Sequence, residues 1–299
     1  MTLQRILLAL LIRLSPLFRD ELYIKMRYRI EMGRKLDFNK CRTMNEKLQW
    51  LKINNRYPEM TDIVDKIKVK KIISKMIGSQ YVVPTLKVWD SADDINICDI
   101  ARLPEKFVIK TNHSGGNTGV IICKDKSKLD LIALRKKLDI SMQTDIYQSL
   151  REWPYKNVER RIFAEEYLGD NIVDYKFYCF DGYVDSVMLC LGRQSAQHTK
   201  FYFFNKDWKL CRYNKSGKEA PADFTLPKPY GMDKMFEIAA TLSKGHPFIR
   251  VDLYNVSGQI YFGELTFFPA SGFDPNRLPE TDLYFGDKIN LSLAQNTTS

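Results

Sequence analysis

The sequence lacks the cysteine pairs and histidine clusters by which several classes of protein are recognised. Its six cysteines are dispersed over 299 residues without a C-x-x-C pair, and its three histidines are not at metal-ligand spacing. A disulfide framework and a zinc site are therefore not expected. Cysteines inside apolar runs indicate buried reduced thiols, and hence a cytoplasmic protein. The Walker A sequence G-x-x-x-x-G-K-[ST] is also missing.

Blocks of basic residues are missing as well, although the chain is basic. Lys+Arg number 46 against 36 Asp+Glu, a formal net charge of +10, which favours an anionic partner such as a nucleotide or an acidic sugar. Without such blocks or a zinc-finger, homeodomain or RNP signature, nucleic acid is not an expected partner. A hydrophobic content of 44% indicates a folded chain, long enough for about two domains.

The N-terminus has no apolar run long enough for a membrane span. The stretch from Ile6 to Ile12, between Arg5 and Arg13, is shorter than the roughly 20 residues required, and no signal-peptide cleavage site follows it. Two interpretations stay open: a helix packed on the body of the protein, or a basic amphipathic helix lying peripherally on the inner membrane face. The second places five basic residues near lipid phosphates: Arg13, Arg19, Lys25, Arg27 and Arg29.

Helices are predicted among strands that are mainly linked by hairpins. Thr43 and Glu46 have capping-box spacing, which predicts a helix start. Other helices are predicted over 61–77 (ending at Gly78, with Ile63, Ile67, Ile72 and Met76 as its apolar side), 127–142 and 232–244. Predicted strands are 81–89, with a proline typical of an edge, then 107–110, 120–124, 161–168, 174–180, 184–192, 200–205, 248–256 and 259–269. Turns are expected at 181–182 and 257–258. This pattern favours an α+β class with antiparallel sheets.

The stretch FVIKTNHSGGNTGVIICKD, residues 107–125, ends a strand at Lys110 and sets three glycines before the next strand. Backbone N–H groups in such a turn can converge on phosphate oxygens while the ammonium supplies a point charge. Taken alone, glycines between strands more often mark a plain hairpin. His113 lies within this loop.

Two carboxylates lie on the last pair of predicted strands. A hairpin centred at 257–258 sets Asp252 one step out of register with Glu264, so the two converge if a bulge or twist adjusts their faces. Buried carboxylates need a charged partner or a metal, and oxygen ligands suit magnesium. In the alternative, Glu264 faces water and Asp252 pairs with a basic neighbour, Arg250 or Lys244.

In their order along the chain, these motifs resemble the ATP-grasp superfamily, and more closely its TupA-like branch, found among capsule, teichuronopeptide and other surface-polysaccharide proteins. The sequence segments that carry this resemblance lie within about residues 38 to 290. They include NEKLQWLKINNR, DKIKVKKII, RIFAEEYL, FIRVDLYNVSGQIYFGELTF and SGFDP. The resemblance implies an ATP-grasp fold of two α+β lobes clasping a nucleotide. It divides the chain into a basic amphipathic helical extension (1–37), a substrate-side region (38–105), a central lobe with the glycine loop (106–168) and a C-terminal lobe with the metal site (169–299).

Site residues follow from the same resemblance. Those implied to bind ATP are Lys71 or a neighbour on its helix, Lys110, Ser114, Gly115, Gly116, Gly119, Glu165, Glu166, Tyr167 and Asp174. Those implied to hold Mg2+ are Asp252, Glu264 and Thr266, and those implied to act on the transferred phosphate are Lys110, Lys176 and Arg250. ATP-grasp ligases commonly have E-x-N where this chain has Glu264-Leu265-Thr266, which leaves tight binding of a second metal in doubt.

The implied reaction joins a carboxylate to an amine through an acylphosphate, at the expense of ATP, on a component of capsule, O-antigen or a teichuronic-type polymer. The acid would be a uronic acid, another acidic sugar or an amino acid, and the amine an amino acid or amino sugar. Some relatives are called glycosyltransferases, so transfer from a nucleotide-sugar is the rival, although the usual D-x-D is missing. A nucleotide-binding scaffold without catalysis is the third interpretation.

Overall fold

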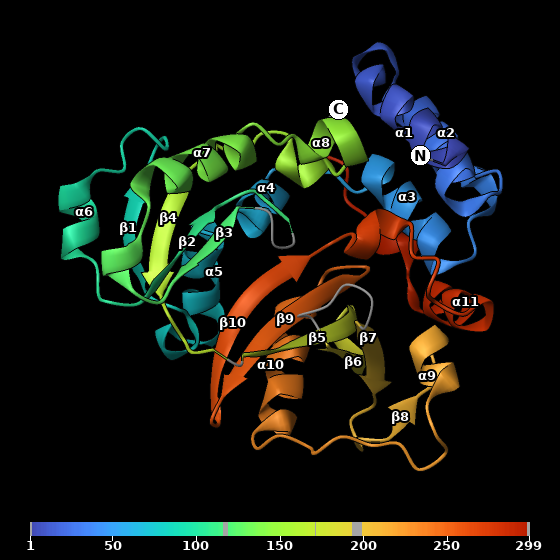
Figure 1. Cartoon of the computed structure of the whole chain (residues 1–299). Helices are drawn as coiled ribbons and strands as arrows, with labels where there is room; N and C mark the ends of the chain where they lie inside the picture. Colours follow the sequence, from blue (N-terminus) through green and yellow to red (C-terminus); the bar gives the residue numbers. More distant parts are fainter. Residues whose placement is uncertain (1, 116–118, 171, 193–198, 298–299) are drawn as a thin grey trace. The chain divides into compact units, whose positions relative to one another are not determined.

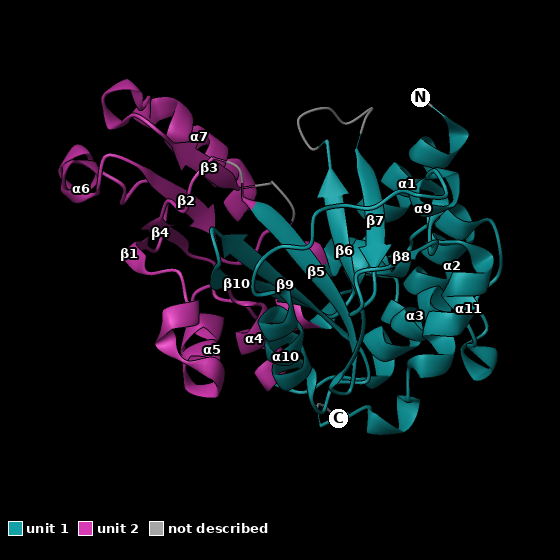
Figure 2. Cartoon of the chain, turned by 90° about the horizontal axis from the view of Figure 1, so that it is seen from below, with its two compact units in different colours: residues 1–58, 147–153, 173–299 teal, residues 59–146, 154–172 magenta. Residues whose placement is uncertain are grey.

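The computed structural model of the protein describes residues 2–115, 119–170, 172–192 and 199–297 (Figure 1). They form two compact units (Figure 2). Unit 1 comprises residues 1–58, 147–153 and 173–299, and unit 2 comprises residues 59–146 and 154–172. The units are thus interleaved along the chain, whereas the sequence analysis predicted four consecutive segments.

Unit 2 contains a four-stranded antiparallel sheet in the order β1-β4-β2-β3. The strands are β1 (Thr85–Trp89), β2 (Phe107–Thr111), β3 (Val120–Cys123) and β4 (Ile162–Glu166). The edge position predicted for the proline-led strand is confirmed, because β1 follows Pro84 and pairs only with β4 among the described strands.

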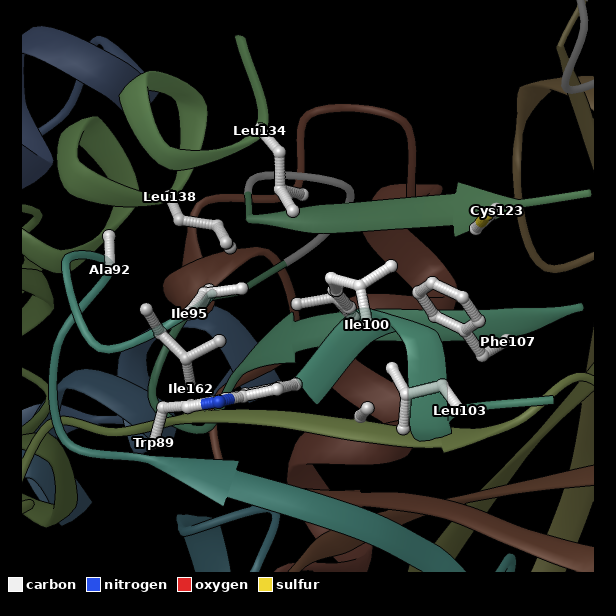
Figure 3. Close-up of a cluster of buried hydrophobic side chains, with 12 residues drawn as sticks. Trp89, Ala92, Ile95, Ile100, Leu103, Phe107, Cys123, Leu134, Leu138 and Ile162 are labelled. Atoms are coloured by element: carbon white, nitrogen blue, oxygen red, sulfur yellow. The ribbon is translucent and has the colours of Figure 1, made fainter. Parts of the chain in front are cut away.

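One face of this sheet carries the core of unit 2 (Figure 3). Side chains at alternate positions of the strands, such as Phe107 and Ile109 of β2, pack with Leu134 and Leu138 of α7 (Leu131–Met142) and with Ile100 of α6 (Ile97–Arg102). Lys110 and Glu165 occupy the intervening positions of β2 and β4. Strand alternation therefore sends them to the other face, away from the apolar cluster.

The helix predicted over 61–77 is two helices, α4 (Glu59–Val64) and α5 (Lys68–Ile77). The carboxylate of Asp65 accepts hydrogen bonds from the backbone N–H groups of Ile67, at 2.8 Å, and Lys68, at 3.2 Å. It thereby caps a new helix start and interrupts the first. The predicted apolar side is also wrong, because α5 buries Val69 and Ile73. The other short helices of unit 2 are η3 (Ser79–Tyr81) and η4 (Lys126–Lys128). Helices α8 (Ile146–Leu150) and η5 (Trp153–Tyr155) fall at two of the changes of unit along the chain, at 146–147 and 153–154.

Unit 1 contains a six-stranded antiparallel sheet in the order β10-β9-β5-β6-β7-β8. Its strands are β5 (Val173–Phe180), β6 (Tyr183–Leu191), β7 (Lys200–Phe204), β8 (Leu210–Cys211), β9 (Ile249–Val256) and β10 (Gln259–Thr266). The two predicted tight turns are confirmed. Their residues adopt left-handed backbone, with φ of 47° and 83° at 181–182 and 52° and 92° at 257–258.

Helices pack against this sheet through aromatic contacts. Phe236 of α10 (Met232–Ser243) meets Phe177 edge-on at 5.1 Å between ring centroids, and Phe285 of α11 (Pro279–Lys288) stacks on Tyr178 at 5.5 Å. The remaining elements here are α9 (Lys215–Glu219), η6 (Pro269–Gly272) and η7 (Leu291–Leu293). These contacts fix the inner strands, on which the candidate site lies.

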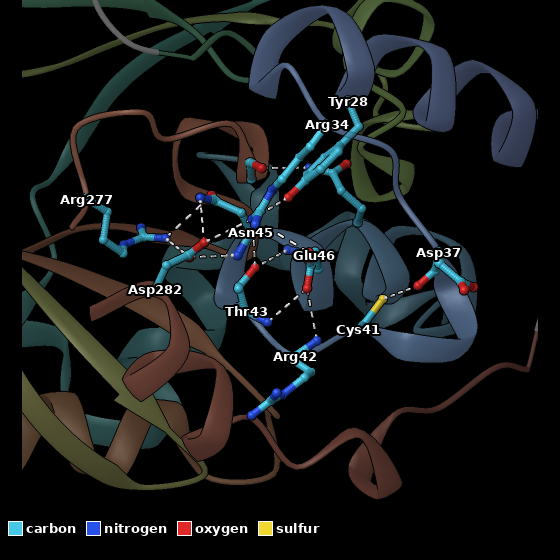
Figure 4. A network of polar contacts seen from close by, with 12 residues as sticks. Tyr28, Arg34, Asp37, Cys41, Arg42, Thr43, Asn45, Glu46, Arg277 and Asp282 are labelled. Carbon is cyan, nitrogen blue, oxygen red and sulfur yellow. Dashed lines mark hydrogen bonds and ion pairs between the residues drawn. The ribbon is translucent and has the colours of Figure 1, made fainter. Parts of the chain in front are cut away.

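The helices α3 (Met44–Asn54) and α11 pack closely. The predicted capping box is present, with Thr43 accepting from the Glu46 N–H and Glu46 accepting from the Thr43 N–H. Asp282 of α11 accepts hydrogen bonds from the Asn45 N–H, at 3.0 Å, and from Arg277, at 3.1 Å (Figure 4). A Cβ at Gly286 would lie 2.0 Å from a backbone oxygen of residue 42, so only glycine permits this approach.

The N-terminal extension forms α1 (Leu3–Arg13), η1 (Ser15–Leu17) and α2 (Asp20–Met32), followed by η2 (Phe38–Lys40). Arg27 of α2 is buried, donates to the Ser149 carbonyl and pairs with Glu31 at 3.2 Å, so its predicted contact with lipid phosphate is wrong. Across the part of the chain that is described, every helix is too short or too polar to cross a membrane.

Candidate functional site

Unit 2 gathers two lysines on one buried carboxylate. Glu165, at the end of β4, has an exposed side-chain fraction of only 8%. It accepts one hydrogen bond from Lys110 of β2 and another from Lys70 of α5, at 2.8 Å. Lys70 also donates to the Val83 carbonyl at 2.9 Å. We call Lys70, Lys110 and Glu165 the lysine cluster.

The electrostatics of the lysine cluster keep its carboxylate charged. Burial opposes ionisation of Glu165, but the charges of Lys110 and Lys70 outweigh it and lower the pKa. Burial also lowers the pKa of Lys70, which the charge of Glu165 only partly opposes. Two cations thus converge on one anion, and the lysine cluster retains a net positive charge suited to an anionic ligand.

Lys71, which the resemblance favoured on this helix, lies elsewhere. It is exposed, whereas its neighbour Lys70 reaches Glu165. The helical period explains the difference, because Val69 and Ile73 face the core and residue 71 is turned about half a revolution away from them. The prediction allowed for a neighbouring lysine, and the true apolar side would have pointed to Lys70.

The start of the glycine loop is tightly held. The buried Ser114 hydroxyl accepts a hydrogen bond of 2.6 Å from Thr111, and the Ser114 carbonyl accepts one of 2.5 Å from Lys66. Gly119 has φ of 74°, and a Cβ there would lie 2.1 Å from the Ser141 hydroxyl. The glycine is therefore required by the hairpin itself. Gly115 is exposed, and Gly116 lies outside the described residues.

His113 is buried within this loop segment. Burial, together with the positive charges of Arg160 and Lys66, lowers its pKa to about 4. The ring is therefore neutral at neutral pH and adds no positive charge. At the other end of the β2–β4 pair, Glu166 is exposed where β4 ends, and Tyr167 is half-buried beyond it.

Unit 1 brings the two predicted metal carboxylates together. Asp252 of β9 lies opposite Glu264 of β10, and the register shifts between Phe262 and Glu264, so the unpaired Gly263 is the bulge that the sequence analysis required. Without it, Asp252 would face Gly263 and the carboxylate of Glu264 would point to the other face of the sheet.

Arg250 bridges the oxygen atoms of this site. Its Nη2 lies 2.7 Å from Asp252 Oδ2, 3.0 Å from Glu264 Oε1 and 3.1 Å from the Thr266 hydroxyl. Its Nε lies 2.6 Å from Asp252 Oδ1. Three oxygen-bearing side chains therefore converge on one cationic group. We call Asp252, Glu264, Thr266 and Arg250, with Lys176, the carboxylate cluster.

Lys176 on β5 completes the carboxylate cluster. Its ammonium donates to Asp252 and pairs with Asp174 at 2.6 Å. Burial raises the pKa of Asp252, but Arg250 and Lys176 outweigh it and the net shift is downward. Burial by itself would lower the pKa of Arg250 and of Lys176. The negative charge of Asp252 outweighs burial for both groups, so the net shift of each pKa is upward. The carboxylate of Asp252 and the two cations therefore each keep the other charged.

The donor set fits a hard divalent cation. Asp252, Glu264 and Thr266 offer only oxygen atoms, which suit magnesium, and these oxygens already surround a positive charge. The described residues contain no group of three or more His, Cys, Asp or Glu placed to hold a metal. Two carboxylates and a hydroxyl would hold the magnesium ion, whose charge would stabilise negative oxygen atoms bound beside it.

A buried group that the sequence analysis missed lies in unit 1. Lys52 of α3 is fully buried and donates to the Ser271 hydroxyl at 2.7 Å and to the Ser271 and Leu150 carbonyls at 2.9 Å. Burial lowers its pKa to about 7, although the charge of the buried Glu152 opposes this. The sequence carries no signal for this pair, because residues 52 and 152 meet only through the fold.

The chain has an α+β architecture, with helices packed against antiparallel sheets. The model of the family described as TupA-like ATPgrasp matches residues 46–290. The chain belongs to the TupA-like ATP-grasp family.

Several solved structures are similar to this chain. They include a D-alanine–D-alanine ligase from Bacillus anthracis complexed with ATP, at 15% identity over 85% of this chain and 72% of that one, with a TM-score of 0.46. Another is a biotin carboxylase from Campylobacter jejuni in a β,γ-ATP complex, at 14% identity over 83% and 50%, with a TM-score of 0.48. A search of curated proteins found no match.

Proposed function

We propose that the protein is an ATP- and magnesium-dependent carboxylate–amine ligase. The observation that carries this proposal is the convergence of Asp252, Glu264 and Thr266 on Arg250, beside Lys176, in a member of the ATP-grasp family. Three oxygen donors and two cations at one place are what a transferred phosphoryl group and its metal need.

The lysine cluster is proposed to bind the nucleotide. Lys110 and Lys70 would each exchange part of their contact with Glu165 for phosphate oxygens, while the Glu165 carboxylate keeps both ammonium groups aimed at one point. Glu166 and Tyr167 follow at the same strand end, where the family resemblance places the adenine and ribose. Asp174, paired with Lys176, is proposed to belong to the ribose and phosphate side.

The carboxylate cluster is proposed to serve the chemical steps. Magnesium held by Asp252, Glu264 and Thr266 would offset charge on the phosphates. A carboxylate oxygen of the acid attacks the γ-phosphorus, the bond to the β–γ bridging oxygen breaks, and ADP leaves. The amine then attacks the acyl carbon of the acylphosphate, inorganic phosphate departs and the amine loses a proton to water. Arg250 and Lys176 stabilise the transferred phosphoryl group in both steps.

The substrates are proposed to belong to surface-polysaccharide synthesis. This assignment rests on the family resemblance and on the formal charge of +10, which favours an acidic sugar or amino acid as the carboxylate. An amino acid or amino sugar would be the amine. Six free cysteines and an ATP substrate support a cytoplasmic location.

Trapping the acylphosphate tests the proposal independently of the amine. The protein is incubated with ATP, magnesium, hydroxylamine and one candidate acid at a time, and ADP and the acyl hydroxamate are measured. An acid that yields both supports the ligase. Asp252→Asn should abolish both products, whereas Asp233→Asn, on the exposed surface of α10, should change neither.

Two results would overturn the proposal. Consumption of a nucleotide-sugar with transfer of its sugar, and no ADP from any acid, would establish the glycosyltransferase alternative. Binding of ATP without hydroxamate from uronic acids, other acidic sugars or amino acids, equally in the native protein and in Asp252→Asn, would establish a nucleotide-binding scaffold.

A further inference from the structure

Helix α1 carries apolar side chains on two of its sides. At 100° per residue, five aliphatic side chains spaced three and four positions apart form one stripe along the helix and its C-cap. All five are exposed, with fractions of 71%, 40%, 44%, 51% and 44% for Leu3, Ile6, Leu7, Leu10 and Leu14. We call them the leucine stripe. Single exposed leucines are ordinary on a protein surface, but an aligned row of five marks a contact surface.

A second side of α1, next to the leucine stripe, already holds the helix in place. Leu11 is buried at 7% exposure, and the Gln4 side chain donates a 2.9 Å hydrogen bond to the Ile30 carbonyl of α2. Just beyond the helix, the Ser15 carbonyl accepts a 2.6 Å hydrogen bond from Arg151. Packing of unit 1 therefore uses one side of α1 and leaves the leucine stripe facing outward.

Charge distinguishes between the surfaces that could cover the leucine stripe. Residues 1–19 contain three arginines, at positions 5, 13 and 19, and no Asp or Glu. All three arginines are exposed, and at 100° per residue Arg13 falls beside the stripe, whereas Arg5 lies on the far side of the helix. A second copy of this chain would bring like charges together, whereas an anionic surface would attract them.

We propose that α1 lies flat on an anionic lipid bilayer, with the leucine stripe in the acyl boundary and Arg13 and Arg19 at the lipid phosphates. A helix of this kind binds by buried apolar area plus attraction to acidic headgroups, without spanning the bilayer. The surface lies on α1 and uses neither the lysine cluster nor the carboxylate cluster, so it is independent of the proposed ligase activity.

Vesicle flotation with the full chain tests this surface. The protein should float with vesicles of equal parts phosphatidylcholine and phosphatidylglycerol, and far less with phosphatidylcholine alone. Leu7→Gln/Leu10→Gln should weaken binding by about tenfold or more, because each leucine contributes buried apolar area. Arg13→Gln/Arg19→Gln should weaken binding to the anionic vesicles and reduce its dependence on salt.

A matched control uses apolar residues that are equally exposed but lie outside the leucine stripe. Ile97 and Ile132 of unit 2 are exposed at 75% and 81%. The variant Ile97→Gln/Ile132→Gln should float like the native protein, and circular dichroism should show the same helix content in all variants. Failure of the native protein to bind anionic vesicles would overturn the proposal. So would a dimer in sedimentation that Leu7→Gln/Leu10→Gln dissociates, since the stripe would then belong to a second copy.

Discussion

Glu264 lies directly across from Asp252 because the single residue Gly263 is left out of the pairing between β9 and β10. A Cβ at Gly263 would lie 3.0 Å from the Asp252 carbonyl oxygen and 3.2 Å from the Tyr254 ring, so the bulge is tight enough to favour glycine. One residue without a side chain thus decides whether two carboxylates share a face of the sheet. The phosphoryl-transfer site that we propose depends on this pairing.

Thr266 is the residue by which the carboxylate cluster departs from the common E-x-N pattern, and its substitution tests the metal assignment. Thr266→Asn should lower the magnesium concentration needed for half-maximal ATP turnover, because an amide oxygen reaches further and is a stronger ligand. Thr266→Val, which removes the oxygen while keeping the shape, should raise it by about tenfold. A magnesium titration of ADP release measures both. Equal requirements in the two variants would mean that the hydroxyl does not bind the metal.

Lys70 and Lys71 provide a matched pair for the nucleotide assignment. Lys70→Met should weaken ATP binding by about tenfold or more, because a charge-assisted hydrogen bond contributes roughly 1.5–3 kcal/mol. Lys71→Met should leave binding unchanged, since that side chain is exposed on the other side of α5. Titration of the ATP-dependent shift in Tm compares them. If the Lys71 variant is the weaker binder, the lysine cluster does not hold the nucleotide.

Local signals in the sequence predicted most of the strands and the turns between them. β5 and β6 flank a predicted Asp-Gly turn, and β9 and β10 flank a predicted Ser-Gly turn. In such hairpins the register follows from the turn, which set Asp252 within one position of Glu264. The convergence of the two carboxylates also required the bulge at Gly263, which the turn alone does not predict. The capping box at Thr43 was predictable for the same reason, because its partners lie three residues apart.

The errors arise where contacts distant in sequence decide the outcome. Asp65 interrupts the predicted helix of 61–77 by capping α5, and the core then selects Val69 and Ile73 rather than the expected apolar side. That choice turns Lys70 toward Glu165, 95 residues away. The burial of Arg27 likewise depends on a carbonyl 122 residues further on. Periodicity alone does not contain this information.

Because His246 is largely buried, we expect the free energy of unfolding to fall in mild acid. Burial lowers its pKa from 6.5 to about 4, while its Nδ1 lies 3.1 Å from the Tyr57 hydroxyl. Between these two pH values the unfolded chain binds a proton at this site and the folded chain does not, so the free energy of unfolding falls as the pH falls from 6.5 to about 4. His246→Asn should flatten that decline. Urea unfolding across this range measures the slope, to which His113 contributes in the same direction. An unchanged slope in the variant would show that His246 is already charged in the folded protein.

We expect substitutions of Lys52 and Glu152, both buried in unit 1, to have coupled effects on the free energy of unfolding. Removing the cation by Lys52→Met should destabilise the fold by about 3–5 kcal/mol, because the carboxylate of Glu152 would stay buried without its opposite charge. The same change removes the two hydrogen bonds from Lys52 to Ser271, whose backbone is left-handed at φ of 52°, and leaves the Ser271 carbonyl with the hydrogen bond from Gln49.

The double variant Lys52→Met/Glu152→Gln should recover part of the loss, since neither charge remains. The matched control Lys40→Met, at an exposed lysine, should change the free energy of unfolding by less than about 0.5 kcal/mol. A double-mutant cycle from urea unfolding gives the coupling energy. If the two single variants add without coupling, Glu152 is protonated in the fold, and Lys52 then acts only through its hydrogen bonds to Ser271 and Leu150.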